Sequence, residues 1–277
     1  MPQYTVIGQP IAHSLSPQIH QTFAKLTQRK IQYTRTEATK DTFTSTVKKF
    51  QANGGQGCNV TVPFKEDAFE LCDRLHESAS LARAVNTLWM HKDGSLVGHN
   101  TDGSGLLQDL EARHHIALAG KRILILGAGG ATRGVIGPLL SRAPEQLDIA
   151  NRTTERSELL AADFSQLGNI KGFGLDALET GGAYDVVLNA TSMSLQGAAP
   201  PLTKNNFSKG AAAYDLMYSA EDTPFMAQCR SMGVEQVYDG FGMLVEQAAD
   251  AFLIWEGVRP KTQLAYAELT ELKQTSK

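Results

Sequence analysis

The stretch that decides the fold reads Lys121-Arg122-Ile123-Leu124-Ile125-Leu126-Gly127-Ala128-Gly129-Gly130-Ala131-Thr132-Arg133-Gly134. Its first six residues have the pattern of a short buried strand, with a continuous apolar run from Ile123 to Leu126. A glycine turn follows at once, and an apolar helix then extends to about Ser141. Strand, glycine turn and helix in this order bring free backbone N–H groups close to the pyrophosphate of a dinucleotide. Thr132 stands where the strict fingerprint has its third glycine, so the motif alone is a weak signal. The prediction of cofactor binding rests mainly on the position of the motif between an expected strand and an expected helix.

The segment after the next expected strand, Gln146–Ala150, indicates which dinucleotide is bound. A carboxylate there would favour a free ribose 2′-hydroxyl, but the chain has Asn151-Arg152-Thr153-Thr154-Glu155-Arg156. Arg152 and Arg156 offer fork-shaped donors for a 2′-phosphate, which favours NADP. The alternative is that Arg156 is only a helix-surface charge, and Glu155 counts against a phosphate site.

Further strands alternate with helical patterns on the carboxyl side of this motif. We expect strands at 184–189, 211–216 and 235–240, which predicts a doubly wound parallel sheet with ligands at the carboxyl ends of its strands. Two helices, at about 243–256 and 261–274, close the chain, and the first carries Gln247.

The amino-terminal part also alternates strands and helices. We expect strands at 4–8 and 31–35, helices at 17–26, 41–51 and 78–83, and a hairpin of 84–90 with 96–99. Pro17 fits the first turn of a helix, which makes Ser16 its expected N-cap. Ser14 and Ser16 are expected to point the same way and would suit a small carboxylate. Capping by Ser16 and simple exposure of Ser14 form the alternative.

The segment Asn59-Val60-Thr61-Val62-Pro63-Phe64-Lys65 has the pattern of a functional site, with a row of hydrogen-bonding groups that ends in an amine. Read as extended backbone, it puts Asn59, Thr61 and Lys65 on one face and the apolar residues on the core face. Pro63 ends the strand, and a helix is expected from Lys65 to Leu75. A cation at the positive end of that helix breaks a local rule, which suggests a function for Lys65. A solvated surface lysine is the alternative, and this segment alone favours it, since most lysines are exposed.

Two more polar residues have competing interpretations. Asp102 opens an expected helix with Leu106, Leu107 and Leu110 on its apolar side, so it is either an N-cap or a catalytic group. Asn86 stands at a strand entrance, where a turn residue is the plain alternative.

Composition sets the class of protein. The chain has 277 residues, 42% hydrophobic and 20% charged, which is typical of globular proteins and long enough for two domains. A net charge of −3 gives no electrostatic case for binding nucleic acid or an anionic membrane. The three cysteines form no CxxC pair, and the seven histidines form no HExxH motif, so we expect a reducing cytoplasm and no metal. We see no signal peptide and no apolar run of about 18 residues.

Six motifs together resemble those of the shikimate dehydrogenase family from end to end of the chain. They are Ser14-Leu15-Ser16-Pro17, Asn59-Val60-Thr61-Val62-Pro63-Phe64-Lys65, Ala84-Val85-Asn86-Thr87, Gly98-His99-Asn100-Thr101-Asp102-Gly103, Gly127-Ala128-Gly129-Gly130-Ala131 and Asn151-Arg152-Thr153.

The resemblance implies an α/β protein of two domains. Residues 1–102 with 243–277 would form an α/β substrate-binding and catalytic domain, and residues 103–242 a Rossmann-type NADP domain. The implied reaction is the reversible NADPH-dependent reduction of 3-dehydroshikimate to shikimate, on the route through chorismate to aromatic amino acids. The implied partner is therefore a small-molecule substrate, with no nucleic acid and no membrane, and we expect a monomer or homodimer.

The resemblance also implies roles for individual residues. The catalytic pair would be Lys65 and Asp102. The substrate-binding positions would be Ser14, Ser16, Thr61, Lys65, Asn86, Asp102, Tyr218 and Gln247. The cofactor positions would be Glu77, Gly127, Ala128, Gly129, Gly130, Ala131, Asn151, Arg152, Thr153, Arg156, Leu216 and Gly240. Thr132, where the family often has a small residue, and Leu216, where methionine is common, depart from the family pattern.

Three rival interpretations stay open at this stage. The chain could be a quinate/shikimate dehydrogenase that accepts NAD, against which Arg152 and Arg156 argue. It could be a non-catalytic NADP-binding module, which loss of Lys65 or Asp102 would favour, and both are present. It could also be another two-domain NADP enzyme acting on a different cyclic substrate.

Overall fold

The computed structural model describes residues 1–191 and 193–275, which fold into two compact units. Unit 1 comprises Met1–Gly105 and Leu244–Lys277, and unit 2 comprises Leu106–Met243. The chain passes from one unit to the other inside helix α5 (Asp102–Leu107) and returns inside helix α9 (Phe241–Glu256). No helix in this described part is both long and apolar enough to cross a membrane.

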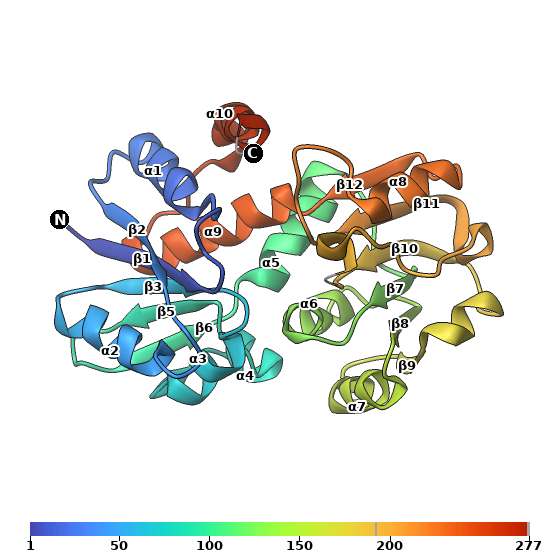
Figure 1. The fold of residues 1–277 in the computed structure, drawn as a ribbon, viewed down its shortest axis with the longest axis horizontal. Coiled ribbons are helices and arrows are strands. Elements are labelled where there is room, and N and C mark those ends of the chain that lie inside the picture. Colours follow the sequence, from blue (N-terminus) through green and yellow to red (C-terminus); the bar gives the residue numbers. More distant parts are fainter. Residues whose placement is uncertain (192, 276–277) are drawn as a thin grey trace. The chain divides into compact units, whose positions relative to one another are not determined.

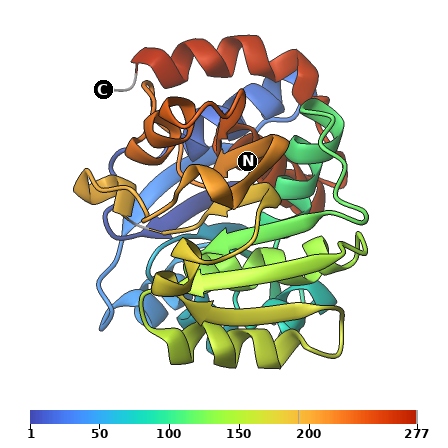
Figure 2. The ribbon, with the colours of Figure 1, turned by 90° about the vertical axis from the view of Figure 1, so that its right-hand side faces the viewer.

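Unit 2 is built on a six-stranded sheet in the order β12-β11-β10-β7-β8-β9, in which all paired strands are parallel (Figure 2). Its strands are β7 (Arg122–Leu126), β8 (Gln146–Asn151), β9 (Ile170–Gly174), β10 (Tyr184–Asn189), β11 (Phe207–Asp215) and β12 (Gln236–Asp239). Counted within the unit, this is the order 3-2-1-4-5-6 of a Rossmann fold. The strand order therefore reverses between β7 and β10, where such folds bind ligands.

Alternate residues of β7 pack into cores on opposite faces of this sheet. Ile123 and Ile125 join one buried apolar cluster, and Leu124 and Leu126 join another. The continuous apolar run that predicted β7 reflects this burial on both faces. The helices of the unit are η1 (Gln108–Arg113, a π-helix), α6 (Gly130–Leu140), α7 (Thr154–Phe164), η2 (Leu175–Glu179), η3 (Met193–Gln196), η4 (Lys204–Asn206) and α8 (Pro224–Ser231).

Unit 1 has its own six-stranded sheet, in the order β2-β1-β3-β5-β6-β4. Its strands are β1 (Gln3–Gly8), β2 (Gln32–Glu37), β3 (Gly57–Val60), β4 (Arg74–Leu75), β5 (Thr87–Met90) and β6 (Leu96–His99). β1 pairs in parallel with β2 and β3, whereas β5 pairs antiparallel with β3 and β6. The expected hairpin is confirmed, with β5 as its first strand.

Five further helices belong to the described part of unit 1. They are α1 (Ser16–Leu26), α2 (Phe43–Ala52), α3 (Lys65–Leu71), α4 (Glu77–Ala82) and α10 (Thr262–Thr275). The first and last of these lie side by side (Figure 1), joined by a Lys25–Glu268 ion pair of 3.3 Å.

The prediction of an extended segment from Asn59 to Lys65 is wrong beyond its first two residues. Strand β3 ends at Val60, and the chain turns before α3 begins at Lys65. Val62, expected in the core, is 67% exposed, whereas Phe64 is fully buried as expected. The expected helix from Lys65 to Leu75 is also too long, because it ends at Leu71 and the chain returns to the sheet as β4.

The prediction that Ser16 caps α1 is wrong as well. Leu15 occupies the N-cap position and makes no side-chain cap bond, and Ser16 is already helical. The Ser14 hydroxyl instead accepts a hydrogen bond of 3.3 Å from the Ser16 backbone N–H.

Candidate functional site

A lysine and an aspartate form an ion pair at the head of two helices of unit 1. Nζ of Lys65, the first residue of α3, lies 2.6 Å from Oδ2 of Asp102, the first residue of α5. Only 16% of the lysine side chain and 8% of the aspartate side chain are exposed. Asp102 was expected to cap its helix or act in catalysis; its two carboxylate oxygens accept from side chains, Oδ2 from Lys65 and Oδ1 from Asn86. The two residues predicted as a catalytic pair are therefore in direct contact.

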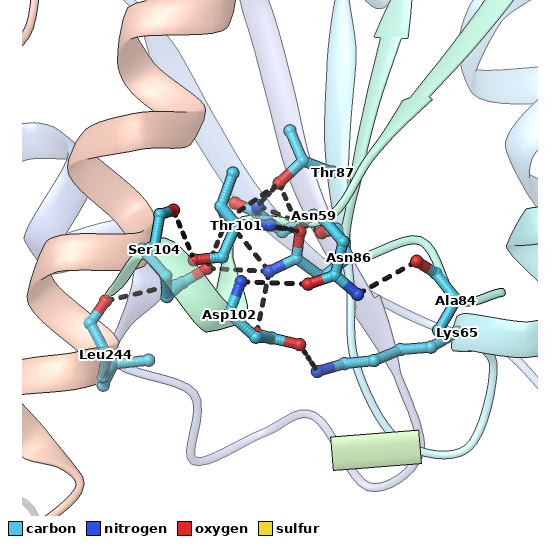
Figure 3. A network of polar contacts seen from close by, with 11 residues as sticks. Asn59, Lys65, Ala84, Asn86, Thr87, Thr101, Asp102, Ser104 and Leu244 are labelled. Atoms are coloured by element: carbon cyan, nitrogen blue, oxygen red, sulfur yellow. Dashed lines mark hydrogen bonds and ion pairs between the residues drawn. The ribbon is translucent and has the colours of Figure 1, made fainter. Parts of the chain in front are cut away.

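Asn86 stands at the centre of the polar network around this pair (Figure 3). Its Nδ2 donates to Asp102 Oδ1 at 2.8 Å and to Thr101 Oγ1 at 2.9 Å. Gln247, from α9, places its Oε1 3.3 Å from the same Nδ2. Asn86 lies in the bend before β5, where a turn residue was the alternative, but its side chain is buried, with 3% of the residue exposed, and takes part in the network. Four separate segments of the chain, which contain Lys65, Asn86, Asp102 and Gln247, thus contribute to one site.

Two neighbouring residues of this network were absent from the predicted site. Asn100 accepts from the Asp102 backbone N–H at 3.0 Å and donates to the Ala84 carbonyl at 2.9 Å. Thr101 bonds Asn86 through both its backbone N–H and its hydroxyl. Their sequence signal is their place beside Asp102 in the motif from Gly98 to Gly103.

The two serines predicted to hold a carboxylate also lie together. The hydroxyls of Ser14 and Ser16 are 3.1 Å apart. Arg35 Nε donates to the Ser14 carbonyl at 2.8 Å and so fixes the backbone of this loop. Thr61 lies in the turn after β3, where its side chain packs against Gly8 and its backbone N–H donates to the Ile7 carbonyl at 2.9 Å.

The glycine loop of unit 2 has the geometry that a pyrophosphate requires. Gly127 has φ +101°, a region that favours glycine, and an added Cβ would lie 3.2 Å from the Ala190 carbonyl oxygen. Added Cβ atoms on Gly129 and Gly130 would meet nothing within 4 Å. Packing of the described residues therefore does not require glycine at these two positions. Close approach of a ligand to the loop backbone explains better why glycine stands there. The loop opens α6, whose N-cap, Gly129, makes no side-chain cap bond.

Thr132, the departure from the fingerprint, is fully buried in the first turn of α6. Its hydroxyl donates to the Gly127 carbonyl at 2.8 Å. It therefore closes the loop on itself and leaves the ligand side of the loop to the glycines and Ala131.

The segment after β8 presents its cations to solvent. Arg152 and Arg156 are exposed, and neither has a carboxylate partner within 4.0 Å in the described part of the chain. Asn151 donates to the Thr153 carbonyl at 2.9 Å, which shapes the turn that carries Arg152. Both guanidinium groups are thus available for a phosphate.

The remaining predicted residues are divided between the units. Leu216, Tyr218 and Gly240 belong to unit 2, and an added Cβ on Gly240 would overlap the Leu216 carbonyl, so these two strand ends touch. Tyr218 was grouped with substrate residues that otherwise belong to unit 1. Glu77, grouped with cofactor residues of unit 2, is an exposed residue in the first turn of α4 in unit 1.

A buried carboxylate supports the same end of the sheet. Asp215 Oδ1 accepts from Asn189 and from the Met217 backbone N–H, both at 3.1 Å, and Oδ2 accepts from Thr223 at 2.6 Å. Burial raises the pKa of Asp215, and these donors oppose the shift. The carboxylate therefore holds together the loops that follow β10 and β11.

Comparison with known proteins shows relatives that are similar to this chain in sequence and in fold. Residues 6–88 match the family model for the shikimate dehydrogenase substrate binding domain, and residues 109–210 match that for shikimate / quinate 5-dehydrogenase. A shikimate dehydrogenase (NADP(+)) from Aeromonas hydrophila is 51% identical over 269 residues, which is 97% of each chain. The chain belongs to the shikimate dehydrogenase family.

Solved structures agree with this family assignment. The Ael1 enzyme from Pseudomonas putida superposes with a TM-score of 0.90 at 44% identity over 98% of both chains. Shikimate 5-dehydrogenase from Thermus thermophilus, crystallised with NADP(H) and shikimate, gives a TM-score of 0.85 at 30% identity over 100% of both chains. The fold is thus that of shikimate dehydrogenases, with an α/β substrate domain and a Rossmann NADP domain.

Proposed function

We propose that the protein catalyses the reversible NADPH-dependent reduction of 3-dehydroshikimate to shikimate, in the pathway through chorismate to aromatic amino acids. The observation that carries the proposal is the 2.6 Å Lys65–Asp102 pair set in the Asn86 and Gln247 network. An NADP-binding module without catalytic function would have no need of a shielded ion pair in its other unit.

The chemistry requires one proton and one stabilised charge. NADPH supplies the hydride, so the chain must orient the substrate and manage the carbonyl oxygen. Reduction develops negative charge on that oxygen, which the Lys65 ammonium stabilises and to which it can donate a proton. Asp102 holds Lys65 in place, since an ion pair shielded from solvent keeps a long side chain in one orientation.

The substrate-binding roles follow from the polar groups of unit 1. Ser14 and Ser16 take the carboxylate of shikimate through their adjacent hydroxyls. Asn86, Asp102, Thr61 and Gln247 take the ring hydroxyls. Tyr218 is assigned to the substrate by the family resemblance of its position alone. A site that depends on such hydrogen bonds rejects an analogue that lacks one of them.

The cofactor-binding roles belong mainly to unit 2. The loop from Gly127 to Ala131 receives the pyrophosphate, and Asn151, Arg152, Thr153 and Arg156 receive the adenosine 2′-phosphate and ribose. Leu216 and Gly240 lie at strand ends, where the nicotinamide half binds in folds of this order. Glu77 is assigned to the cofactor by its position alone. In this proposal residues 1–102 with 243–277 form the substrate domain and residues 103–242 the NADP domain.

The decisive experiment follows the absorbance of reduced nicotinamide with purified protein, crossing shikimate and quinate with NADP and NAD. Turnover of shikimate with NADP alone supports the proposal. If the protein oxidises quinate, or uses NAD, the result supports a quinate/shikimate dehydrogenase instead. No turnover of any pair, with NADP still bound, supports a non-catalytic module or an enzyme for a different cyclic substrate.

We also propose a cytoplasmic protein that is a monomer or homodimer and binds no nucleic acid. All three cysteines, Cys58, Cys72 and Cys229, are free thiols, and burial raises the pKa of each. Such thiols suit a reducing compartment. The net charge of −3 opposes binding to a polyanion. Sedimentation of the purified protein would settle the oligomeric state.

A further inference from the structure

A buried line of side chains leads from Tyr33 to the catalytic carboxylate. The Tyr33 hydroxyl donates to Asn59 Oδ1 at 2.6 Å, and Asn59 Nδ2 lies 3.1 Å from Thr87 Oγ1. Thr87 Oγ1 lies 2.9 Å from Asn86 Oδ1, and Asn86 Nδ2 lies 2.8 Å from Asp102 Oδ1. The part of this line from Asn59 to Asp102 is visible in Figure 3.

Backbone groups fix the direction of every hydrogen bond in this line. The Thr101 backbone N–H can only donate, so the Asn86 atom 2.9 Å from it is the oxygen and the other amide atom is the nitrogen. The Asn86 carbonyl can only accept, so the Asn59 atom 3.3 Å from it is likewise a nitrogen. Because Thr87 receives a hydrogen bond from Asn59, its own proton is free to go to Asn86 Oδ1.

This direction matters for Asp102. Held as observed, Asn86 points its NH2 group at the carboxylate that pairs with Lys65. An inverted amide would place its oxygen against that carboxylate, which is unfavourable in a site shielded from water. Thr87 is 0% exposed and Asn59 is 6% exposed, so water has little access to take over their role in the free protein.

We propose that Thr87, supported by Asn59, is a positioning residue that keeps the Asn86 amide oriented toward Asp102. The inference rests on the proposed function, because it assigns Thr87 to the same catalytic site. Thr87 itself has no direct role in the chemistry and acts through Asn86.

The test replaces Thr87 with valine, which keeps the shape and removes the hydroxyl. Loss of one net hydrogen bond is expected to lower kcat roughly three- to tenfold and to raise the KM for shikimate, while the dissociation constant of NADP stays unchanged. Thr87→Ser is expected to restore kcat to within about twofold, because it returns the hydroxyl.

Thr5→Val is the matched control. Thr5 is also fully buried in the sheet of unit 1, and its hydroxyl bonds Thr34 and Thr36, away from the line. It is expected to lower the melting temperature about as much as Thr87→Val while leaving kcat unchanged. Equal losses of kcat in the two variants, or no rescue by serine, would overturn the proposal.

Two further measurements separate this proposal from the proposed function. In an Asp102→Asn background, Thr87→Val is expected to change kcat by less than twofold, because its effect passes through Asp102; a full repeat of the loss would contradict this. In the free protein, NMR should show the Asn86 side-chain amide protons exchanging at least about tenfold faster in Thr87→Val than in the wild type. The exchange rate needs no turnover, so an unchanged rate overturns the positioning role even if the wild type fails to oxidise shikimate.

Discussion

Lys65 Nζ and Asp102 Oδ2 are 2.6 Å apart, although 37 positions separate the two residues in the sequence. Each residue begins a helix, α3 and α5 respectively. A cation at the positive end of α3 is locally unfavourable, and the carboxylate of Asp102 offsets that cost. The position of Lys65 is thus less favourable for the stability of α3, but it holds the ammonium in a fixed place. Such local exceptions to the rules of helix stability are common at active sites.

Lys65→Ala is expected to lower kcat about 10²- to 10⁴-fold, the usual range for loss of a general acid. Shikimate affinity should change little, because the hydroxyl and carboxylate ligands stay in place. Steady-state rates and a shikimate titration by calorimetry would check both values. Lys25→Ala is the control. Lys25 also forms an ion pair, with Glu268, but its side chain is 66% exposed and lies outside the predicted site. Wild-type turnover in Lys65→Ala would remove the lysine from the mechanism.

Arg152→Ala and Arg156→Ala are expected to weaken NADP binding by roughly 10- to 100-fold each, since a hydrogen bond to a charged group contributes about 1.5–3 kcal/mol. Binding of NAD should be unchanged because NAD lacks the 2′-phosphate. Fluorescence titrations with both dinucleotides would check the ratio. Arg142→Ala is the control, since Arg142 pairs with Glu111 instead. Equal weakening of NADP and NAD would contradict the 2′-phosphate role.

The Rossmann unit could be predicted because its signals are local. Burial of β7 on both faces produces an unbroken apolar run, and the glycine turn follows directly. Strand β9 was missed, because Ile170–Gly174 contains two glycines and only one buried residue. Gly172 is required there by contact with the Ser157 backbone, which no local pattern reveals.

The site was predicted residue by residue, but its contacts were not. Nothing local brings Gln247 to Asn86, because that contact depends on the packing of α9 in unit 1. Asn59 belonged to the segment predicted as a site, whereas Thr87 has the pattern of an ordinary strand residue. The importance of both lies in the direction of their hydrogen bonds, which the sequence does not give. The expectation for Val62 failed because alternation applies only while the strand continues, and β3 stops at Val60.

Gly129→Ala is expected to fold normally and to bind NADP at least about tenfold more weakly. Its Cβ would meet no described atom within 4 Å, so the folded protein has room for it, whereas a pyrophosphate close to the loop backbone does not. Thermal unfolding and NADP titration would measure the two effects separately. Gly127→Ala is the comparison: it should also lower the melting temperature, because of its φ of +101°. Unimpaired NADP binding by Gly129→Ala would show that the cofactor does not approach there.

Acid should destabilise unit 1 through His20. This residue is fully buried and stacks on Tyr33 at 4.3 Å, and neither ring nitrogen makes a hydrogen bond to a described residue. Burial lowers the pKa of His20 from 6.5 to about 3, and the neighbouring Asn59 opposes the shift. Between these two values the unfolded chain binds a proton that the folded chain does not. The free energy of unfolding therefore falls as pH drops from about 6.5 toward 3, by up to about 1.4 kcal/mol per pH unit.

Urea unfolding at a series of pH values would measure this slope. His20→Phe keeps an aromatic ring beside Tyr33 and removes the titrating group. Between pH 4 and 6 the free energy of unfolding should therefore depend less on pH, with a slope smaller by up to about 1.4 kcal/mol per pH unit, the value for one proton. Burial also lowers the pKa of His99 to about 4, so some acid sensitivity should persist in the variant. His13→Gln, which replaces an exposed histidine, is the control. An identical slope in wild type and His20→Phe would mean that His20 is protonated to the same extent in the folded and unfolded chains.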